Sequence, residues 1–389
     1  MKLFWPQRNF DEALAQLQTQ RLQSPFSEDI LQFTQSLSKR FLQMRHMPEV
    51  VALGYWLRKA NVKAMKQQFE QQQAGKLVCP RGIVFHIAPS NVDTIFVYSW
   101  MLSLFAGNKN IIRLSSKAEV NDVLQVILDI LPQFPAIGER TMICTYGHDE
   151  EAGNVLSQAC HTRVIWGGDA TIEAVRRIPL APMANELAFP DRFSIALLNS
   201  EAVSALTEIE LDALVERFYN DVFWFDQLAC SSPRLVIWQG VSVEAFWRKL
   251  EQKVQQKQYE LLAATQVLKY TTSLQLAAEL YVEAVAPTTY FSRVHVANMP
   301  ANARELHCGG GLFYECHVKA LDEAAKLFID KDQTIAYYGF TNEQLHEFVT
   351  HIQTRGIDRI VPVGQALDFN GIWDGQSFLT SFTREVVIL

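Results

Sequence analysis

Cys230 is the residue best suited in this sequence to act as a nucleophile. It lies in the stretch 223–234, FWFDQLACSSPR, directly before the apolar run 235–238. A thiol on a loop that leads into a buried strand can be held rigidly toward a cleft, as covalent thioester chemistry requires. Taken alone, the residue fits a buried structural thiol better, because free cysteine packs as a small hydrophobic side chain. The aromatic residues 223–225 fit either an acyl channel or plain core.

Asn91 is the candidate for stabilising an oxyanion. It follows the apolar run 82–87 in the segment Ala88-Pro89-Ser90-Asn91, just before the next helical pattern. In open parallel sheets ligands bind beyond the carboxyl ends of the strands, where an Asn amide can donate to a developing negative charge. The alternative is a helix N-cap, for which Asn is equally suited.

Two further strand ends carry candidate cofactor contacts. Gly167 and Gly168 follow the run 163–166 and open a helix that includes Thr171, so backbone N–H groups there could approach a pyrophosphate. Arg113 is the last residue but one of the run 110–114, which is followed by Ser115 and Ser116. An arginine with serines beside an adenosine ribose would hold a 2′-phosphate and favour NADPH over NADH, although a solvated charge at a strand end explains Arg113 as well.

The elements that must position these residues follow a βαβ pattern. Strand-like runs at 82–87, 110–114, 141–145 and 163–166 alternate with helical stretches at about 92–105, 120–131 and 170–177. Strands that alternate with helices predict a parallel sheet covered on both faces. This is a doubly wound α/β architecture of the nucleotide-binding type.

A second α/β block follows the first. It has strands at 193–198 and 235–238 and helices at 206–219 and about 243–264, and the tail adds strand-like runs at 359–363 and 384–388. We expect a helical N-terminal segment (1–75), a dinucleotide-binding domain (76–192), a catalytic domain (193–350) and a β-rich C-terminal strip (351–389). The strip needs an edge to pair with, in its own chain or in a partner, which favours a homo-oligomer.

Composition narrows the class of protein. The 389 residues carry a formal net charge of −7 with 49% hydrophobic and 20% charged residues, which argues against nucleic acid as a partner. Charge appears too early for a secretory signal, and the longest apolar stretch, 95–106, is too short to span a bilayer. We therefore expect a cytoplasmic protein. The six cysteines should be reduced, and the spacing of the His307-Cys308 and Cys316-His317 doublets matches no zinc pattern.

The order of these motifs resembles the aldehyde dehydrogenase superfamily, and within it the LuxC-type acyl-CoA reductases, the fatty acid reductases of bacterial bioluminescence. The likeness rests on the succession IAPSN (87–91), AGN (106–108), Gly167-Gly168, NEL (185–187) and QLACSSPR (227–234), together with RIVPVG (359–364) and WDG (373–375). It covers roughly residues 45–389, and it implies an aldehyde-dehydrogenase-like fold.

The resemblance also implies roles for single residues. Cys230 matches the family nucleophile, Asn91 and the Cys230 N–H match its oxyanion hole, and Gly167 and Gly168 match its pyrophosphate turn. Arg113 lies where many relatives have a ribose-binding lysine, and Glu186 lies near their general-base glutamate. Two departures stand out: Glu186 is followed by Leu187-Ala188-Phe189 instead of a glycine pair, and the segment 307–313, HCGGGLF, replaces a second ribose-binding glutamate. Glu186 could instead have a structural role, such as pairing with Arg192.

The function that follows is NADPH-dependent reduction of a long-chain acyl-CoA or acyl-protein thioester to a fatty aldehyde through an acyl-cysteine. A reductase needs no base to activate water, and such a base would waste the acyl intermediate, so the unusual context of Glu186 favours reduction. The alternatives are a non-acylating aldehyde dehydrogenase and a non-reducing acyl carrier or scaffold subunit. The resemblance further implies an acyl-protein synthetase as a partner.

Overall fold

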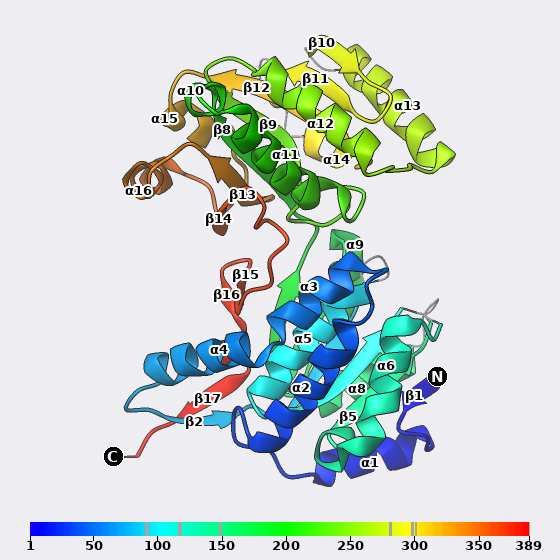
Figure 1. Ribbon diagram of the computed structural model, residues 1–389. Coiled ribbons are helices and arrows are strands. Elements are labelled where there is room, and N and C mark those ends of the chain that lie inside the picture. The colour runs from blue at the N-terminus through cyan, green and yellow to red at the C-terminus, as the bar shows by residue number, and fades with distance from the viewer. Residues whose placement is uncertain are drawn as a thin grey trace. The chain divides into compact units, whose positions relative to one another are not determined.

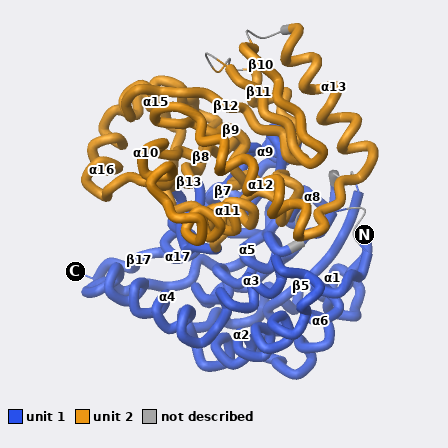
Figure 2. The backbone as a smooth tube through the Cα atoms, turned by 45° about the horizontal axis from the view of Figure 1, so that its top comes forward, with its two compact units in different colours: residues 1–191, 369–389 blue, residues 192–368 orange. Residues whose placement is uncertain are grey.

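The computed structural model describes residues 1–89, 93–115, 119–147, 150–279, 282–296, 299 and 302–388. They form two compact units: unit 1 contains residues 1–191 and 369–389, and unit 2 contains residues 192–368 (Figure 2). The chain therefore leaves unit 1 after Asp191 and returns to it at Phe369.

Unit 1 is built on a sheet of six strands in the described part of the chain, in the order β1-β5-β4-β3-β6-β7. All neighbours are parallel except β1, which runs antiparallel to β5. The strands are β1 (Lys2–Trp5), β3 (Ile83–Ile87), β4 (Lys109–Leu114), β5 (Thr141–Thr145), β6 (Thr162–Trp166) and β7 (Asn185–Phe189). Every residue of β3, β5 and β6 is buried, as expected for strands covered on both faces.

Helices cover both faces of this sheet (Figure 1). Apolar residues of α1 (Phe10–Thr19), α8 (Glu150–Ala159) and α9 (Asp169–Arg176) pack with Phe85 and its neighbours on one face. Helix α5 (Asp93–Phe105) packs against β3 and β4, and α2 (Glu28–Phe41) and α3 (Pro48–Trp56) contact α5 in turn. The remaining helices of the unit are α4 (Lys59–Gln72), α6 (Asp122–Ile130), α7 (Pro135–Gly138) and α17 (Phe378–Ser381).

Unit 2 contains a seven-stranded sheet within the described residues, in the order β10-β11-β12-β9-β8-β13-β14. All neighbours are parallel except β10 and β11. The strands are β8 (Phe193–Asn199), β9 (Pro233–Gln239), β10 (Val282–Pro287), β11 (Ser292–Val296), β12 (Leu312–Val318), β13 (Asp332–Tyr338) and β14 (Arg359–Pro362).

Two apolar clusters enclose the sheet of unit 2. Helices α11 (Glu208–Phe223) and α12 (Glu244–Gln256) bury one face around Trp238 and Phe246. Helices α13 (Ala263–Glu279), α14 (Ala303–Leu306), α15 (Leu321–Ala325) and α16 (Asn342–His351) cover the other face around Tyr314. The short helix α10 (Ser200–Ser204) follows β8.

The expected helix over 243–264 is wrong, because the segment forms the end of one helix and the start of another. Helix α12 ends at Gln256 and α13 begins at Ala263. Gln258 between them has φ 53, a left-handed conformation that ends an α-helix. Its neighbour Tyr259 donates its hydroxyl to Asp226 at 2.6 Å, which fixes the break against the segment before Cys230.

The division into units differs from the four parts expected. Unit 1 ends one residue before the predicted boundary at 192, but the N-terminal helices belong to it because α1 packs on its sheet and α2 and α3 pack on α5. The C-terminal strip divides at 368/369. Strand β14 joins the sheet of unit 2, whereas β17 (Thr383–Val386) pairs antiparallel with β2 (Leu77–Pro80) in unit 1, and β15 (Ile372–Trp373) pairs with β16 (Gln376–Ser377). Because β17 finds its edge in its own chain, it no longer argues for a homo-oligomer.

Candidate active site

Cys230 lies in the turn that joins α11 to β9, as the sequence predicts; we call residues 224–232 the Cys230 turn. The residue is half-buried and forms no disulfide. Its carbonyl oxygen accepts a hydrogen bond from Ser194 Oγ at 2.6 Å, and the Ser232 N–H donates to the Ala229 carbonyl at 3.0 Å. Strand β8, which carries Ser194, therefore fixes the backbone at the candidate nucleophile.

The buried side chain of Gln227 holds the Cys230 turn in place through hydrogen bonds. Its side chain is fully buried, and its backbone has φ 61, a conformation that non-glycine residues seldom adopt. The amide Nε2 donates to the Pro233 carbonyl at 2.8 Å, and Oε1 accepts from the Gly311 N–H at 3.0 Å. Both ends of the side chain are thus bonded, one to the start of β9 and one to a segment 84 residues away.

The run Gly309–Gly311, the glycine turn, packs directly on the Cys230 turn. All three residues have positive φ, between 63 and 78. A Cβ at Gly309 would lie 2.9 Å from the Asp226 carbonyl oxygen and 2.8 Å from the Leu228 side chain, so no larger residue fits there. The Gly310 N–H donates to the same Asp226 carbonyl at 2.8 Å. This run, which replaces the glutamate of the family pattern, supports the turn that carries the candidate nucleophile.

His307 holds the glycine turn through hydrogen bonds at both of its ring nitrogens. Its Nδ1 accepts from the Gly309 N–H at 3.1 Å, so its Nε2 carries the proton and donates to the Leu312 carbonyl at 2.8 Å. Burial lowers the pKa of His307 to about 3, and the nearby Arg234 charge acts in the same direction. The imidazole is therefore neutral at physiological pH.

Arg234 places a buried positive charge four residues after Cys230. Its guanidinium donates to the carbonyls of Gln227 at 3.3 Å and Arg192 at 3.2 Å, and it lies over the Phe193 ring at 5.8 Å. Of the aromatic residues before Cys230, Phe223 is buried in the core, whereas Trp224 is 37% exposed.

The Gly167–Gly168 turn joins β6 to α9 in unit 1. Gly168 is the N-cap of α9, and a Cβ there would meet no atom within 4 Å. A Cβ at Gly167 would lie 3.0 Å from the Thr171 side chain. The turn leaves open space at a helix N-terminus, which suits a phosphate, although the exposed Asp169 adds a negative charge in the first helical turn.

Arg113 lies at the carboxyl end of β4, at the same edge of the sheet as Gly167, because β4 and β6 flank β3 in parallel. It donates to the Tyr146 carbonyl at 3.0 Å and lies over the Tyr146 ring at 5.1 Å. Ser115 follows, and its carbonyl accepts from Thr145 Oγ1 at 2.7 Å. Asn91 and Ser116, two further candidates, lie outside the described residues, so their roles stay predictions.

Glu186 lies at the opposite, amino-terminal end of this sheet. It pairs in register with Arg163, whose guanidinium binds its carboxylate at 2.6 and 2.9 Å, and Arg176 adds a third contact at 2.8 Å. The expected partner Arg192 instead binds Asp358 at 2.8 Å. Glu186 therefore has an ion-pair role in unit 1, and a part in catalysis stays a prediction.

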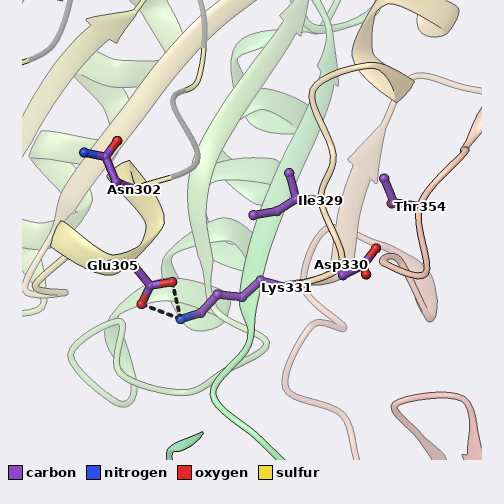
Figure 3. Close-up of a pocket in the computed structure, with 6 residues that line it drawn as sticks. All are labelled: Asn302, Glu305, Ile329, Asp330, Lys331 and Thr354. Atoms are coloured by element: carbon purple, nitrogen blue, oxygen red, sulfur yellow. Dashed lines mark hydrogen bonds and ion pairs between the residues drawn. The ribbon is translucent and has the colours of Figure 1, made fainter.

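A separate depression of about 700 Å³ on unit 2 involves none of the candidate residues. It is lined by Asn302, Glu305, Ile329, Asp330, Lys331 and Thr354 (Figure 3). Lys331 and Glu305 bind each other at 2.7 and 2.8 Å across it. These two charged side chains thus satisfy each other, and Asp330 accepts a hydrogen bond from the Arg355 N–H at 3.0 Å.

Sequence reasoning missed the residues that hold the Cys230 turn. Gln227 and Arg234 stand within the motif around Cys230 but had no assigned role, and the glycine turn was noted only as a departure from the family pattern. Nothing in the local sequence singles out Gln227, because Asp226, Ser231 and Ser232 are polar residues of the same turn. Its partner Gly311 is too distant in sequence to be inferred.

No helix among the described residues is long and apolar enough to cross a bilayer.

Comparison with known proteins places these features in a family. The family model described as acyl-CoA reductase (LuxC) matches residues 5–385. The long-chain acyl-protein thioester reductase of Photorhabdus laumondii is 22% identical over 307 residues, which cover 77% of this chain and 62% of the relative. That of Aliivibrio fischeri is 26% identical over 182 residues, covering 45% of this chain and 36% of the relative. The chain thus matches less than two thirds of the length of either relative.

Solved structures establish the fold. Aldehyde dehydrogenase 21 of Physcomitrella patens superposes with a TM-score of 0.69 at 11% identity and covers 97% of this chain and 90% of its own. Betaine aldehyde dehydrogenase of Staphylococcus aureus gives a TM-score of 0.66 at 11% identity, covering 97% and 86%. The expected aldehyde-dehydrogenase-like α/β fold is confirmed.

Proposed function

Because the chain belongs to the acyl-CoA reductase (LuxC) family, we propose that it reduces a long-chain fatty acyl thioester to a fatty aldehyde through an acyl intermediate on Cys230. The observation that carries this proposal is the rigid Cys230 turn. Gln227 and the glycine turn fix its backbone through buried hydrogen bonds, which is the preorganisation that a nucleophile needs.

The first step exchanges one thioester for another. The Cys230 thiolate attacks the acyl carbonyl, the C–S bond to coenzyme A or to the carrier protein breaks, and the donor leaves as a thiolate. Because one thioester bond replaces another, the step needs positioning and oxyanion stabilisation more than driving force. We assign the oxyanion contacts to the Cys230 N–H and the Asn91 amide, and Arg234 adds a fixed positive charge near the turn.

The second step is reductive. The acyl carbon on Cys230 would accept a hydride, which is the chemistry that NADPH held by Arg113 and the Gly167–Gly168 turn would supply. The resulting thiohemiacetal then collapses, which breaks the C–S bond to Cys230, releases the aldehyde and restores the thiolate. No water enters the cycle, so no general base is required, and the ion pairs of Glu186 with Arg163 and Arg176 are compatible with such a site.

The cofactor assignment rests on two features of unit 1. The open space at Gly168 and the N-terminus of α9, including Thr171, suit a pyrophosphate. Arg113 with Ser115 and Ser116 suits a 2′-phosphate, and Tyr146 holds Arg113 at the strand end. Together they favour NADPH. NADH has no 2′-phosphate, so its ribose would offer no anionic group for the Arg113 guanidinium to bind.

The donor of the acyl group is either acyl-CoA or an acyl-protein. The family description names acyl-CoA, whereas the curated relatives are named for acyl-protein thioesters. An acyl-protein donor implies an acyl-protein synthetase as a partner. We propose a long-chain acyl group because both relatives are named for long chains.

The test is NADPH oxidation in the presence of a long-chain acyl-CoA. Wild-type protein should oxidise NADPH and release aldehyde, Cys230→Ala should do neither, and Arg113→Ala should raise the KM for NADPH more than that for NADH. A non-acylating aldehyde dehydrogenase would instead reduce NADP⁺ when given a fatty aldehyde and water, without an acyl-CoA requirement. A carrier or scaffold subunit would bind no NADPH, and Arg113→Ala would leave its behaviour unchanged.

A further inference from the structure

A cluster of two histidines and one glutamate lies at the carboxyl ends of β11 and β12 in unit 2. His295 on β11 pairs in register with Glu315 on β12, and His317 follows two residues later on the same face of β12. One ligand atom from each of the three residues lies within 4.8 Å of the other two. Figure 1 shows the two strands side by side next to α12. This end of a parallel sheet is where ligands commonly bind.

The surroundings of Glu315 leave an excess of negative charge. Its side chain is fully buried, and its Oε1 accepts hydrogen bonds from Trp238, Trp247 and Ser242 at 2.6 to 3.0 Å. Arg293 is shared between Glu315 and both oxygens of Glu244. Two carboxylates thus share one guanidinium, and the group carries a net charge of −1.

The second oxygen of Glu315 faces the histidines. Its Oε2 accepts from Arg293 Nε at 2.8 Å and lies 3.4 Å from His295 Nε2. The rings of His295 and His317 are nearly parallel, with centroids 6.5 Å apart. His295 is half-buried and His317 is exposed, so the cluster opens to solvent on the His317 side. Two imidazoles and a carboxylate oxygen are ligands that zinc prefers. Contacts of about 2.0 to 2.2 Å would require the ligand atoms, which lie within 4.8 Å of one another, to move closer around the metal.

We propose that His295, Glu315 and His317 form a binding site for a divalent transition metal, zinc in the first place. Three protein ligands leave the fourth tetrahedral position to water from the exposed side. Trp238, Trp247 and Ser242 orient the carboxylate from behind, as supporting contacts do in known metal sites. The Cys316-His317 doublet divides between the two faces of β12, because Cys316 points into the core.

The site is remote from the reaction centre. Cys230 precedes β9, whereas His317 pairs with Trp238 near the other end of that strand. Seven residues of β9 span roughly 20 Å at 3.3 Å per residue. Bound metal would cross-link β11 to β12 without touching the nucleophile, so the proposal does not depend on the proposed function.

The test is titration of the chelator-treated full-length protein with Zn²⁺, in competition with a chromophoric zinc indicator. Wild-type protein should bind one equivalent, and His295→Ala and His317→Ala should each weaken binding by about tenfold or more. His46→Ala is the matched control, because His46 is an exposed histidine 3.1 Å from a carboxylate, that of Asp122. It should leave the affinity unchanged.

Substitution with Co²⁺ separates this site from the free cysteines. Binding at His295, Glu315 and His317 should give ligand-field bands without intense thiolate-to-cobalt charge transfer, in wild type and in Cys230→Ser alike. His317 is exposed, so His317→Ala should fold normally, and far-UV circular dichroism of this variant checks that it does. Absence of saturable binding by wild type, retention of full affinity in both histidine variants, or a thiolate signature would each overturn the proposal and leave His295 and Glu315 as an ordinary imidazole–carboxylate contact.

Discussion

The Cys230 turn of unit 2 and the Gly167–Gly168 turn of unit 1 both connect a helix and a strand, but they are held in opposite ways. The first is fixed by side chains and backbone groups from distant segments, above all Gln227 and the glycine turn. The second has no side-chain cap, and a Cβ at Gly168 would meet nothing within 4 Å.

The difference matches what each turn must do. A nucleophile requires one fixed geometry, because a displacement of about 1 Å can cost roughly a hundredfold in rate. A phosphate site requires open space and unpaired backbone N–H groups, which a helix N-terminus supplies without side chains. Substitutions in the two turns should therefore have different consequences: those in the Cys230 turn should affect folding and acylation together, and those in the Gly167–Gly168 turn should affect cofactor binding alone.

Gln227→Leu should have the largest effect. It leaves the buried Gly311 N–H and Pro233 carbonyl without their partner, and each such group costs about 1–3 kcal/mol. The free energy of unfolding should fall by about 2–6 kcal/mol, and single-turnover acylation of the folded protein should slow by about a hundredfold. Urea denaturation and rapid-quench acylation measure the two effects. The exposed Gln68→Leu is the control, and equal behaviour of both variants would refute the role of Gln227.

Gly168→Asp should act on the cofactor alone. The new side chain has room, so the fold should be unchanged, but a carboxylate at this helix N-terminus should repel a pyrophosphate and raise the Kd for NADPH by about 10- to 100-fold. Fluorescence titration with NADPH measures the change, and acylation of Cys230 should proceed at the wild-type rate. Gly168→Ala should keep the Kd within about threefold. Unchanged affinity in the aspartate variant would remove this turn from the cofactor site.

Glu186→Gln should affect stability more than chemistry. The substitution removes the charge that faces Arg163, whose side chain is 3% exposed, and should lower the free energy of unfolding by about 2 kcal/mol. NADPH-dependent reduction should stay within about threefold of wild type. Glu70→Gln, which removes a surface pair with Lys66, should cost much less stability. If reduction instead fell a hundredfold at unchanged stability, Glu186 would be the general base that the resemblance implies.

Acid should destabilise both units through buried neutral histidines. Burial lowers the pKa of His307 in unit 2 to about 3 and that of His86 in unit 1 to about 4. The unfolded chain binds these protons below about pH 6.5 while the folded chain does not, so stability is complete above that pH and is lost as the pH falls toward 4 and 3. Each histidine contributes at most about 1.4 kcal/mol per pH unit.

Denaturation curves at several pH values measure this slope. His307→Gln should reduce the dependence of the free energy of unfolding on pH between pH 6.5 and 4, by up to the contribution of one bound proton. Glutamine keeps a hydrogen-bond acceptor and a donor but does not titrate in this range. A slope that the substitution leaves unchanged would mean that His307 is already protonated in the folded protein.

Sequence reasoning was strongest where burial decides the structure. The strand at 141–145 was predicted at its observed bounds because a fully buried parallel strand reads as a short apolar run. Prediction from sequence failed where the structure depends on the backbone conformation of a single residue or on a contact between distant residues. The left-handed Gln258 breaks the expected long helix, and β7, which carries Glu186, was noted only as a motif.

For the candidate site the limit was the same. Local sequence was enough to select Cys230 as the candidate nucleophile and to place it on a turn before the buried strand β9. The contacts that hold it join Gln227 to Gly311 and Ser194 to Cys230, and no local pattern encodes pairs so far apart. Glu186 shows the same limit. Strand register brings it beside Arg163 and the position of α9 brings Arg176 to it, and the residues next to Glu186 in the sequence indicate neither partner.

Intact-protein mass spectrometry after exposure to a long-chain acyl-CoA tests the central claim most directly. Wild-type protein should gain the mass of one acyl group, which NADPH then removes with release of aldehyde, and Cys230→Ala should gain none. Cys230→Ser should be acylated much more slowly, if at all, because a hydroxyl is a far weaker nucleophile than a thiolate. Acylation of Cys230→Ala at the wild-type level, or a wild-type adduct that NADPH does not discharge, would contradict the account.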